Sequence, residues 1–577
     1  MKDHSLAQEG ALEVPEKTSQ HHVEVSSEHL SQEEVEVAPV VTPKTWVVVF
    51  ILSMGYGLSF WPIPVFAAIQ TELATSLGDP NGYIWFIPSW SLAITVCFLL
   101  TGANADLFGR RWFLVGGNIV CFIGQIVIAT AKSNNALIAG LTVTGFGAAN
   151  CQMAAFALSE LLPNKWRHLG IVFADLATLV AVVVGPVTAR YGFYAGNWRW
   201  NFYSAAIAQA LSFLGLYFFY HPPKHPNGIP YAQAFREMDY GGMLLFIFGA
   251  VPFLAGIVFS TIYPTTDPHV IACLVVGAIV LVCFGLWEHF GHKAGWVPRP
   301  LTPTRVFTAG HGRELTFPCI AVAIINMFYY STSIVFPTMI ASFWITDPTA
   351  WREASILSLV QGFAICAGVV VLSFAGGRIR RWNWQVTGYC TFMVTFGVLL
   401  ALVEPDRKAL MCVFVFLSQA GYSAAMYLSI AISQLGVEQK DLGLSGGLSG
   451  CLRFAGGGVA TAVYTTILKN TIAGKTVPYV TSAVQGLVPA SDLPALLSVV
   501  GTTTLSSNYD SAVVAAVGQA MTRATVTGLR VTALSSLAFG MVGIIACALC
   551  KDIDPKMTNK IEVYMENTEF ADRNKYH

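Results

Sequence analysis

The stretch G-A-N-A-D-L-F-G-R-R, from Gly102 to Arg111, is a short polar connector between two long apolar segments. The segment before it covers residues 84–104, and the segment after it covers residues 112–131. Each has about the 20 residues that an α-helix needs to cross the hydrocarbon core of a bilayer. Glycine permits a tight turn, and paired arginines are typical of a loop on the cytoplasmic side. The stretch therefore predicts a hairpin of two transmembrane helices.

The composition extends this prediction to the whole chain. Of its 577 residues, 54% are hydrophobic and only 11% are charged, whereas a soluble protein has about 25% charged residues. Because the formal net charge is zero, no basic surface for nucleic acid is expected. The 12 cysteines lack the spacing of metal ligands, so no metal site is expected. The sequence indicates an all-α polytopic membrane protein.

Hydropathy predicts about 14 transmembrane helices, arranged as six, two and six. The grouping follows from a weak internal repeat, because F-A-G-G-R-I-R-R at Phe374–Arg381 resembles the opening stretch. Among the short loops, those after even-numbered spans contain most of the Lys and Arg residues, including Arg110, Arg111 and Lys440. By the positive-inside rule, both termini are expected in the cytoplasm. The expected spans are residues 46–69, 84–104, 112–131, 135–159, 169–189, 202–220, 241–261, 269–288, 316–342, 354–375, 385–403, 409–434, 443–467 and 530–550.

These spans define the predicted segments. They are a disordered acidic cytoplasmic tail (1–43), an N-terminal six-helix bundle (44–222), two linking helices with cytoplasmic loops (223–315), a C-terminal six-helix bundle (316–550) and a cytoplasmic tail (551–577). A long extracellular loop is expected at residues 469–529. Within it, segments near 491–500 and 511–523 are predicted to form amphipathic helices on the membrane surface, and a flexible loop is the alternative.

The opening stretch resembles the signature G-x-L-x-D-R-x-G-R-R of the major facilitator superfamily. The match implies a transporter fold, although Asn104 and Leu107 depart from the signature. A carboxylate near a helix N-terminus or an arginine can stabilise one conformation over another, so a conformational latch is expected. An ordinary positive-inside turn is the alternative. The predicted latch residues are Gly102, Asp106, Gly109, Arg110 and Arg111.

Gly185 and Pro186 in the fifth span resemble part of a signature of antiporters in that superfamily, which favours export. Leu141 stands where many drug:proton antiporters carry a buried arginine, so proton coupling would need another group. Asp175 and Arg453 are the candidates, because ionisable groups inside a membrane usually face a cavity or a partner. An interfacial Asp175, and an Arg453 that binds an anion or forms a structural pair, are the alternatives.

Longer blocks resemble a fungal fourteen-span group that includes trichothecene efflux pumps, with siderophore–iron transporters as a sister branch. These blocks begin at Ser159 (S-E-L-L-P-N-K-W-R), Gly196 (G-N-W-R-W-N-F-Y), Met238 (M-D-Y-G-G) and Lys440 (K-D-L-G-L-S-G-G). The resemblance implies a toxic or secondary metabolite, or a drug, as substrate. Aromatic and amide side chains suit such an amphipathic compound. The predicted lining residues are Trp61, Gln152, Asn326, Tyr329, Tyr330, Gln361, Gln419 and Tyr427.

The energy source and location follow by elimination and analogy. No G-x-x-x-x-G-K-[ST] loop for ATP occurs, so the proton gradient is the expected driving force. The leading hypothesis is proton-driven efflux by a monomer in the lipid of the fungal plasma membrane, without cofactor or metal. The alternatives are proton-coupled uptake of ferric siderophores, a non-transporting membrane sensor, and a vacuolar location. No motif offers a nucleophile or a cofactor cradle, so an enzyme is not expected.

Overall fold

The computed structural model describes residues 41–223, 230–264, 266–345, 347, 350–489, 491–500 and 505–574. Within these residues the regular structure is helical, apart from one isolated β-bridge between Gln485 and Val488. Among the described residues, fourteen helices are long and apolar enough to cross a membrane, as the sequence predicts. The predicted acidic tail lies outside the described residues up to residue 40.

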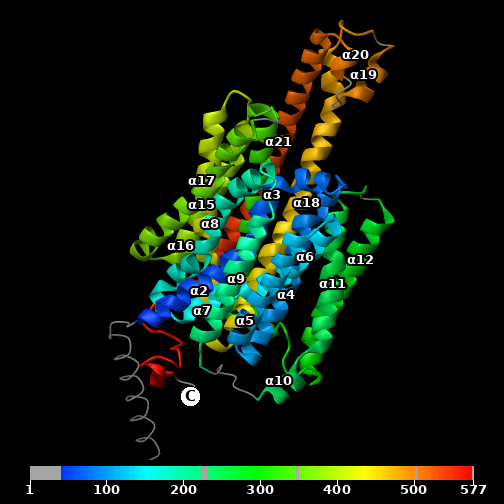
Figure 1. Ribbon diagram of the computed structural model, residues 1–577. Coiled ribbons are helices and arrows are strands. Elements are labelled where there is room, and N and C mark those ends of the chain that lie inside the picture. The colour runs from blue at the N-terminus through cyan, green and yellow to red at the C-terminus, as the bar shows by residue number, and fades with distance from the viewer. Residues whose placement is uncertain are drawn as a thin grey trace, which may run out of the picture.

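The first six spans form the N-terminal bundle (Figure 1). Helix α2 begins where the Thr42 side chain accepts a hydrogen bond from the Thr45 amide at 3.3 Å, with Pro43 at the first helical position. Helix α4 stops at Gly109, whose φ of 82° is easily adopted only by glycine. The helices are α2 (Pro43–Phe60), α3 (Pro62–Ser76), α4 (Phe86–Phe108), α5 (Arg110–Thr130), α6 (Asn134–Gln152), α7 (Ala154–Glu160), α8 (Arg167–Tyr194) and α9 (Trp200–Phe219).

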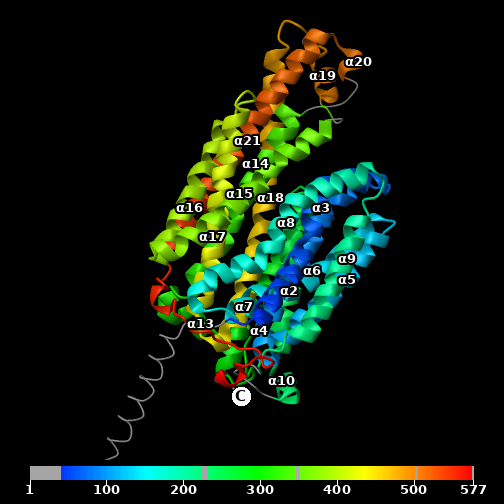
Figure 2. The ribbon, with the colours of Figure 1, turned by 60° about the vertical axis from the view of Figure 1, so that its left-hand side comes forward.

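The last six spans form the C-terminal bundle, which stands beside the first in Figure 2. Between them in sequence, helices α11 (Tyr240–Phe259) and α12 (Pro268–Leu286) pack against each other, preceded by the short α10 (Tyr231–Glu237). The order of six, two and six helices is therefore confirmed. The C-terminal helices are α14 (Thr316–Met339), α15 (Trp351–Ile379), α16 (Trp382–Val398), α17 (Lys408–Gly436), α18 (Leu442–Ala483) and α21 (Ser511–Leu549).

Helices α18 and α21 extend beyond the bundles and form a projecting hairpin, which we call the tower (Figure 1). The expectation of a long loop at 469–529 is therefore wrong for most of its length. Residues 511–523 are the first turns of α21 rather than a surface helix, whereas α19 (Leu493–Val499) matches the short helix predicted near 491–500. Hydropathy misses the extensions because they contain polar residues. They remain helical by packing Val480, Leu496 and Val517 into a small apolar cluster.

The end of the molecule with the tower is here called the top, and the end where residues 41 and 574 lie is called the base (Figures 1 and 2). At the base, residues 551–574 cross from the C-terminal bundle to the N-terminal bundle; we call this segment the strap. It is hydrogen-bonded to both bundles rather than extended away from them. Its bonds include Trp382 N to Asp552 Oδ1 (3.1 Å), Lys556 Nζ to Leu435 O (2.7 Å), Lys165 N to Thr558 O (2.8 Å), Asn164 N to Lys560 O (2.9 Å) and Val563 N to Glu160 O (3.2 Å).

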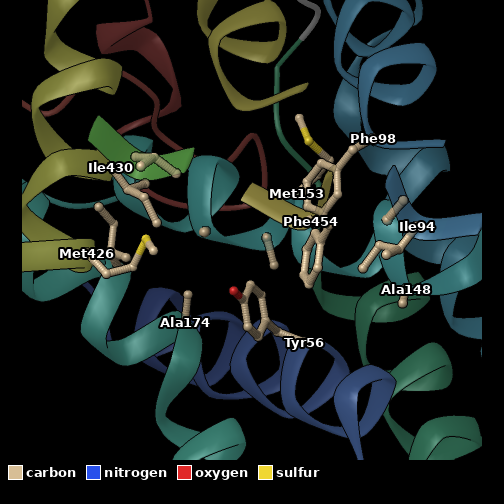
Figure 3. Close-up of a cluster of buried hydrophobic side chains, with 14 of the residues drawn as sticks. Tyr56, Ile94, Phe98, Ala148, Met153, Ala174, Met426, Ile430 and Phe454 are labelled. Atoms are coloured by element: carbon tan, nitrogen blue, oxygen red, sulfur yellow. The ribbon is translucent and has the colours of Figure 1, made fainter. Parts of the chain in front are cut away.

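The largest apolar cluster runs through the N-terminal bundle and joins it to the C-terminal bundle on the base side. Figure 3 shows part of it, with side chains from α2, α4 and α8 facing side chains from α17 and α18. Phe98 and Phe454 stack with ring centres 5.9 Å apart, so aromatic contact joins α4 to α18. The bundles are therefore closed against each other on the base side. The labelled members are Tyr56, Ile94, Phe98, Ala148, Met153, Ala174, Met426, Ile430 and Phe454.

Candidate functional site

The main cavity lies between the two bundles and extends from the middle of the fold to the top. Its volume is about 690 Å³, within the range of about 300–1,000 Å³ that is usual for small-molecule sites. At the top it reaches Tyr83, Thr261 and Lys469, which lie where helices leave the bundle. Toward the base it ends at Gln152 and Phe454, and Phe454 stacks there on Phe98. The cavity is thus closed at the base and continues toward the top.

Three side chains from both bundles converge on the floor of this cavity. Asp175 on α8 is only 4% exposed, and its carboxylate accepts a hydrogen bond from the Tyr427 hydroxyl on α17. Arg453 on α18 interacts electrostatically with both groups, and its guanidinium lies 5.5 Å from the centre of the Phe454 ring. An acid of the N-terminal bundle therefore accepts a hydrogen bond from a phenol of the C-terminal bundle, and a cation of that bundle interacts with it electrostatically.

The depth of Asp175 is explained by the beginning of α8. Arg167 and His168, in the first turn of this helix, are only 2% and 3% exposed. The adjacent residues Asn164 and Lys165 are covered by the strap, through the backbone hydrogen bonds described above. A carboxylate two turns into the helix is therefore already inside the protein. The structure places Asp175 in the cavity wall rather than at the membrane interface.

A polar bracket from α14 and α17 surrounds the backbone of Arg453. The Asn326 amide donates to the Arg453 carbonyl oxygen at 2.7 Å, and the Tyr422 hydroxyl donates to Asn326 Oδ1 at 3.1 Å. Tyr422 in turn stacks on Tyr329, with ring centres 4.4 Å apart. Gly457 allows this packing, because a Cβ atom there would lie 2.6 Å from the Tyr330 ring. The bracket fixes the part of α18 that carries Arg453.

The predicted lining residues divide into two groups. Gln152, Asn326, Tyr329, Tyr330 and Tyr427 face the cavity. Trp61, Gln361 and Gln419 are not among its lining residues in the described part of the chain. Gln419 is 1% exposed inside the C-terminal bundle, and Trp61 lies at the break between α2 and α3.

Several lining residues were missed by sequence reasoning. The Tyr56 hydroxyl points into the interior between Ala174 and Phe454 in Figure 3. The adjacent Gly57 could have indicated that this part of α2 faces another helix. A Cβ atom there would overlap Ala177 of α8, so glycine is needed for the close approach. Tyr422 has a comparable signal in the adjacent Gly421, because a Cβ atom there would lie 2.9 Å from the Met393 amide nitrogen of α16.

The predicted latch residues lie at the base, where α4 meets α18. Asp106 accepts hydrogen bonds from the Gly443 and Leu444 amides at 2.9 and 2.8 Å. These amides are at the N-terminus of α18, where helix N–H groups lack partners and the helix dipole favours a negative charge. Gly102 permits the approach, because a Cβ atom there would lie 2.5 Å from Gly447 Cα. Gly102 and Asp106 thus join the two bundles.

The other three predicted latch residues have separate positions. Arg110 lies 3.5 Å from Asp106 and forms an ion pair with Glu160, which also accepts a hydrogen bond from Gln439 of the C-terminal bundle. Gly109 forms the turn, and Arg111 donates to the Tyr217 carbonyl oxygen at 3.0 Å in the N-terminal bundle. Glu160 is 5% exposed and extends the base contact.

Gly185 and Pro186 lie within α8, above Asp175 on the way to the top. A Cβ atom on Gly185 would lie 3.2 Å from the Pro64 side chain of α3, so the glycine supports close packing of these two helices. Neither residue is among those that line the cavity in the described part of the chain. Their relation to antiport remains a prediction.

Two six-helix bundles around a central cavity have the fold of the major facilitator superfamily. The human organic anion transporter MFSD10 has a TM-score of 0.54 at 12% identity, covering 88% of this chain and 100% of the other. The proton:xylose symporter XylE also has a TM-score of 0.54 at 12% identity, covering 88% and 95%. At this identity these similarities establish the fold alone.

The chain belongs to the fungal trichothecene efflux pump (TRI12) family, whose model matches residues 41–576. It is 54% identical to the MFS-type transporter prx5 of Penicillium rubens, over 90% of this chain and 94% of that protein. It is 23% identical to the trichothecene efflux pump TRI12 of Fusarium sporotrichioides, over 88% and 86%. The resemblance seen in the sequence is confirmed. The protein is a multi-pass membrane transporter of small molecules rather than an enzyme.

Proposed function

We propose that the protein exports a toxic or secondary metabolite in exchange for protons, by alternating access between the two bundles. The observation that carries this proposal is the hydrogen bond from Tyr427 to the buried Asp175 carboxylate at the floor of the cavity, beside Arg453. At this place an ionisable group lies next to a cavity of substrate size, and the hydrogen bond connects the two bundles that move in alternating access. Membership of an efflux pump family supports export as the direction.

The proposed mechanism follows from the charge of Asp175. As a carboxylate it accepts the Tyr427 bond and attracts Arg453, and both interactions stabilise the closed base. Protonation from the top removes the negative charge and weakens both, which favours separation of the bundles at the base. The proton then leaves from the base, and the compound enters from there. Restoring the charge closes the base again, so that the compound is released at the top.

The cavity suggests the class of compound. Aromatic rings from Tyr56, Tyr329 and Tyr330 and many aliphatic side chains surround a few polar groups. Such a lining suits a compact, amphipathic natural product, because rings give adaptable contact and sparse polar groups fix orientation. A trichothecene-like compound or drug is the proposed substrate, by analogy with the relatives named as trichothecene efflux pumps.

The proposed setting is the fungal plasma membrane, with the base and both termini in the cytoplasm. The basic loops on the base side support this orientation through the positive-inside rule. The proposed active unit is a single chain surrounded by lipid, since the cavity is built from one chain. A vacuolar location is the alternative, and it keeps the same orientation.

The test uses inside-out plasma-membrane vesicles containing the protein, whose lumen corresponds to the outside of the cell. We expect a radiolabelled trichothecene to accumulate in the lumen when the lumen is acidic, and a protonophore to abolish accumulation. Vesicles with Asp175→Asn protein, matched for the amount of correctly folded transporter, are the control. Accumulation that survives the protonophore contradicts proton coupling.

The same vesicles separate the alternatives. Proton-coupled release of a preloaded ferric siderophore from the lumen, without trichothecene accumulation, identifies an importer. Neither movement, in vesicles with normally inserted protein, favours a sensor.

A further inference from the structure

Helices α4 and α18 are in contact on the base side and enclose the cavity on the top side. On the base side, Phe98 and Phe454 stack with ring centres 5.9 Å apart, and at the level of the cavity the Trp90 ring meets Phe454 edge-on at 5.4 Å. On the top side, both helices present residues to the cavity, such as Ser91 of α4 and Thr465 of α18. The seam between the two bundles therefore requires a further wall above the level of Phe454.

The linking helix α11 lies on this seam. It packs against both α4 and α18, and residues of its top half line the cavity. At the top, Lys469 of α18 donates to the Thr261 carbonyl oxygen at 3.4 Å. Trp85, in the short η1 helix (Gly82–Trp85) before α4, meets Phe259 edge-on with ring centres 5.2 Å apart. Helix α11 is thus attached to one helix of each bundle.

Helix α12 supports α11 from outside. A Cβ atom on Gly277 of α12 would lie 2.5 Å from the Phe253 amide nitrogen, so the two backbones are in close contact. Another side of α11 is exposed: the Phe248 side chain on it is 64% exposed. Helix α11 therefore has one side in the cavity and another available to lipid.

We propose that α11 forms a wall of the substrate site, and that Leu254, Ile257 and Val258 contact the transported compound and help to select it. This proposal rests on the proposed function, because it assumes that the transported compound binds in this cavity. The three side chains are aliphatic, so they select by shape and apolar contact rather than by charge. The two linking helices are then part of the transport site, although they belong to neither six-helix bundle.

The first test measures access to the wall without any transport. Single cysteines are introduced at Val258, at the exposed Phe248 and at Ser498 in α19 of the tower, and intact cells are treated with a membrane-impermeant maleimide. Wild-type protein gives the background from its native cysteines. We expect Val258→Cys and Ser498→Cys to react and Phe248→Cys, facing lipid, to remain unlabelled. An unreactive Val258→Cys beside a reactive Ser498→Cys overturns the proposed wall.

The second test asks whether the compound touches the wall. An excess of a trichothecene is expected to slow labelling of Val258→Cys at least threefold and to leave Ser498→Cys unchanged. Equal labelling rates with and without the compound overturn the substrate contact.

The third test measures selection. Ile257→Ala is expected to raise KM for the trichothecene by about tenfold, as removal of apolar contact in a pocket does. Phe248→Ala, on the same helix but facing outward, is expected to leave KM unchanged. An unchanged KM in Ile257→Ala, while wild-type vesicles transport normally, overturns the inference and leaves the proposed function standing. Absence of transport in wild-type vesicles refutes the proposed function, whereas the labelling test still reports on the wall.

Discussion

The Asp175 carboxylate on α8 accepts a hydrogen bond from the Tyr427 hydroxyl on α17, 252 residues later in the chain. This bond joins the bundles at the floor of the cavity, and Asp106 joins them at the base through the N-terminus of α18. The two contacts lie at different levels of the same closed side. Under the proposed mechanism, a compound passes the base only when both contacts are broken.

Replacing Tyr427 by Phe removes the hydrogen bond and keeps the Asp175 charge. A hydrogen bond to a charged group contributes about 1.5–3 kcal/mol, so the closed base becomes roughly tenfold or more less favoured. We expect cysteines introduced at the base to react faster with a permeant maleimide in Tyr427→Phe. The control is Tyr564→Phe in the strap, whose ring lies beside Phe570 outside the cavity. Equal reactivity in wild-type and Tyr427→Phe proteins argues against a role in closure.

Asp175→Asn is expected to abolish the dependence of transport on the proton gradient. The amide preserves size and can still accept from Tyr427, but it does not titrate. Exchange of labelled for unlabelled compound across the membrane should persist, because exchange at equilibrium needs no net proton movement. The measurement compares gradient-driven accumulation with exchange in the same vesicles. Asp79→Asn, in the loop at the top, is the matched control. Gradient-driven accumulation by Asp175→Asn at the wild-type rate refutes the assignment.

Asp106→Asn is expected to weaken the latch without preventing insertion. The amide lacks the charge that the α18 N-terminus stabilises, which costs about 1–2 kcal/mol, or about tenfold in the conformational equilibrium. Distances between spin labels on the two bundles at the base should shift toward the open population. Glu438→Gln is the control, because Glu438 pairs with Lys440 at the surface and does not contact Asp106. An unchanged distance distribution leaves Asp106 with a role in the turn only.

Gly102→Val is expected to prevent closure of the base. A Cβ atom at this position would overlap the Gly443 carbonyl oxygen, and backbone cannot move aside as a flexible side chain can. The variant should insert normally, remain open at the base and accumulate no compound. Gly116→Val in α5 is the control, since no atom lies within 4 Å of its Cβ position. Wild-type transport by Gly102→Val contradicts the close approach of α4 and α18.

The strap should stay docked at neutral pH through Glu562. Burial alone would raise the pKa of this carboxyl, but hydrogen bonds from Asn164 and Lys560 outweigh it and hold the pKa below its ordinary value. A lowered folded-state pKa means that the charged form stabilises docking above the ordinary pKa of about 4.3. That contribution is lost as the pH falls through the lower, folded-state value.

Hydrogen exchange measures this docking directly. At pH 7, Glu562→Gln is expected to speed exchange of the amides in residues 558–566 by roughly fivefold, since a part-exposed charged hydrogen bond contributes about 1 kcal/mol. The exposed Glu569→Gln is the control. Equal protection in both variants shows that Glu562 does not hold the strap.

The class of fold follows from the sequence because bilayer thickness imposes a length on every span, and the described part of the chain contains 14 helices of that length. The hairpin at Gly102–Arg111 was found because glycine and charge mark a turn locally. The tower was not found, because α18 and α21 continue as helices by packing on each other, which a hydropathy window does not register. Asp175 was predicted as a site residue because it is an isolated acid in an apolar run. Its partner Tyr427 was predicted only as one of several residues that line the cavity. Gln419 and Tyr422 differ by about one helical turn, and sequence alone did not indicate which of them faces the cavity.

The position of the strap has a consequence for biosynthesis. Residues 551–574 leave the ribosome after all 14 helices, yet they pair with a segment made much earlier: Glu562 accepts from Asn164, 398 residues before it. During synthesis the base therefore lacks this cover until the strap has been made, and only then can the backbone amides of Asn164 and Lys165 form their hydrogen bonds to it. Docking of the strap is accordingly a late step of assembly, which follows synthesis of the helices that it covers.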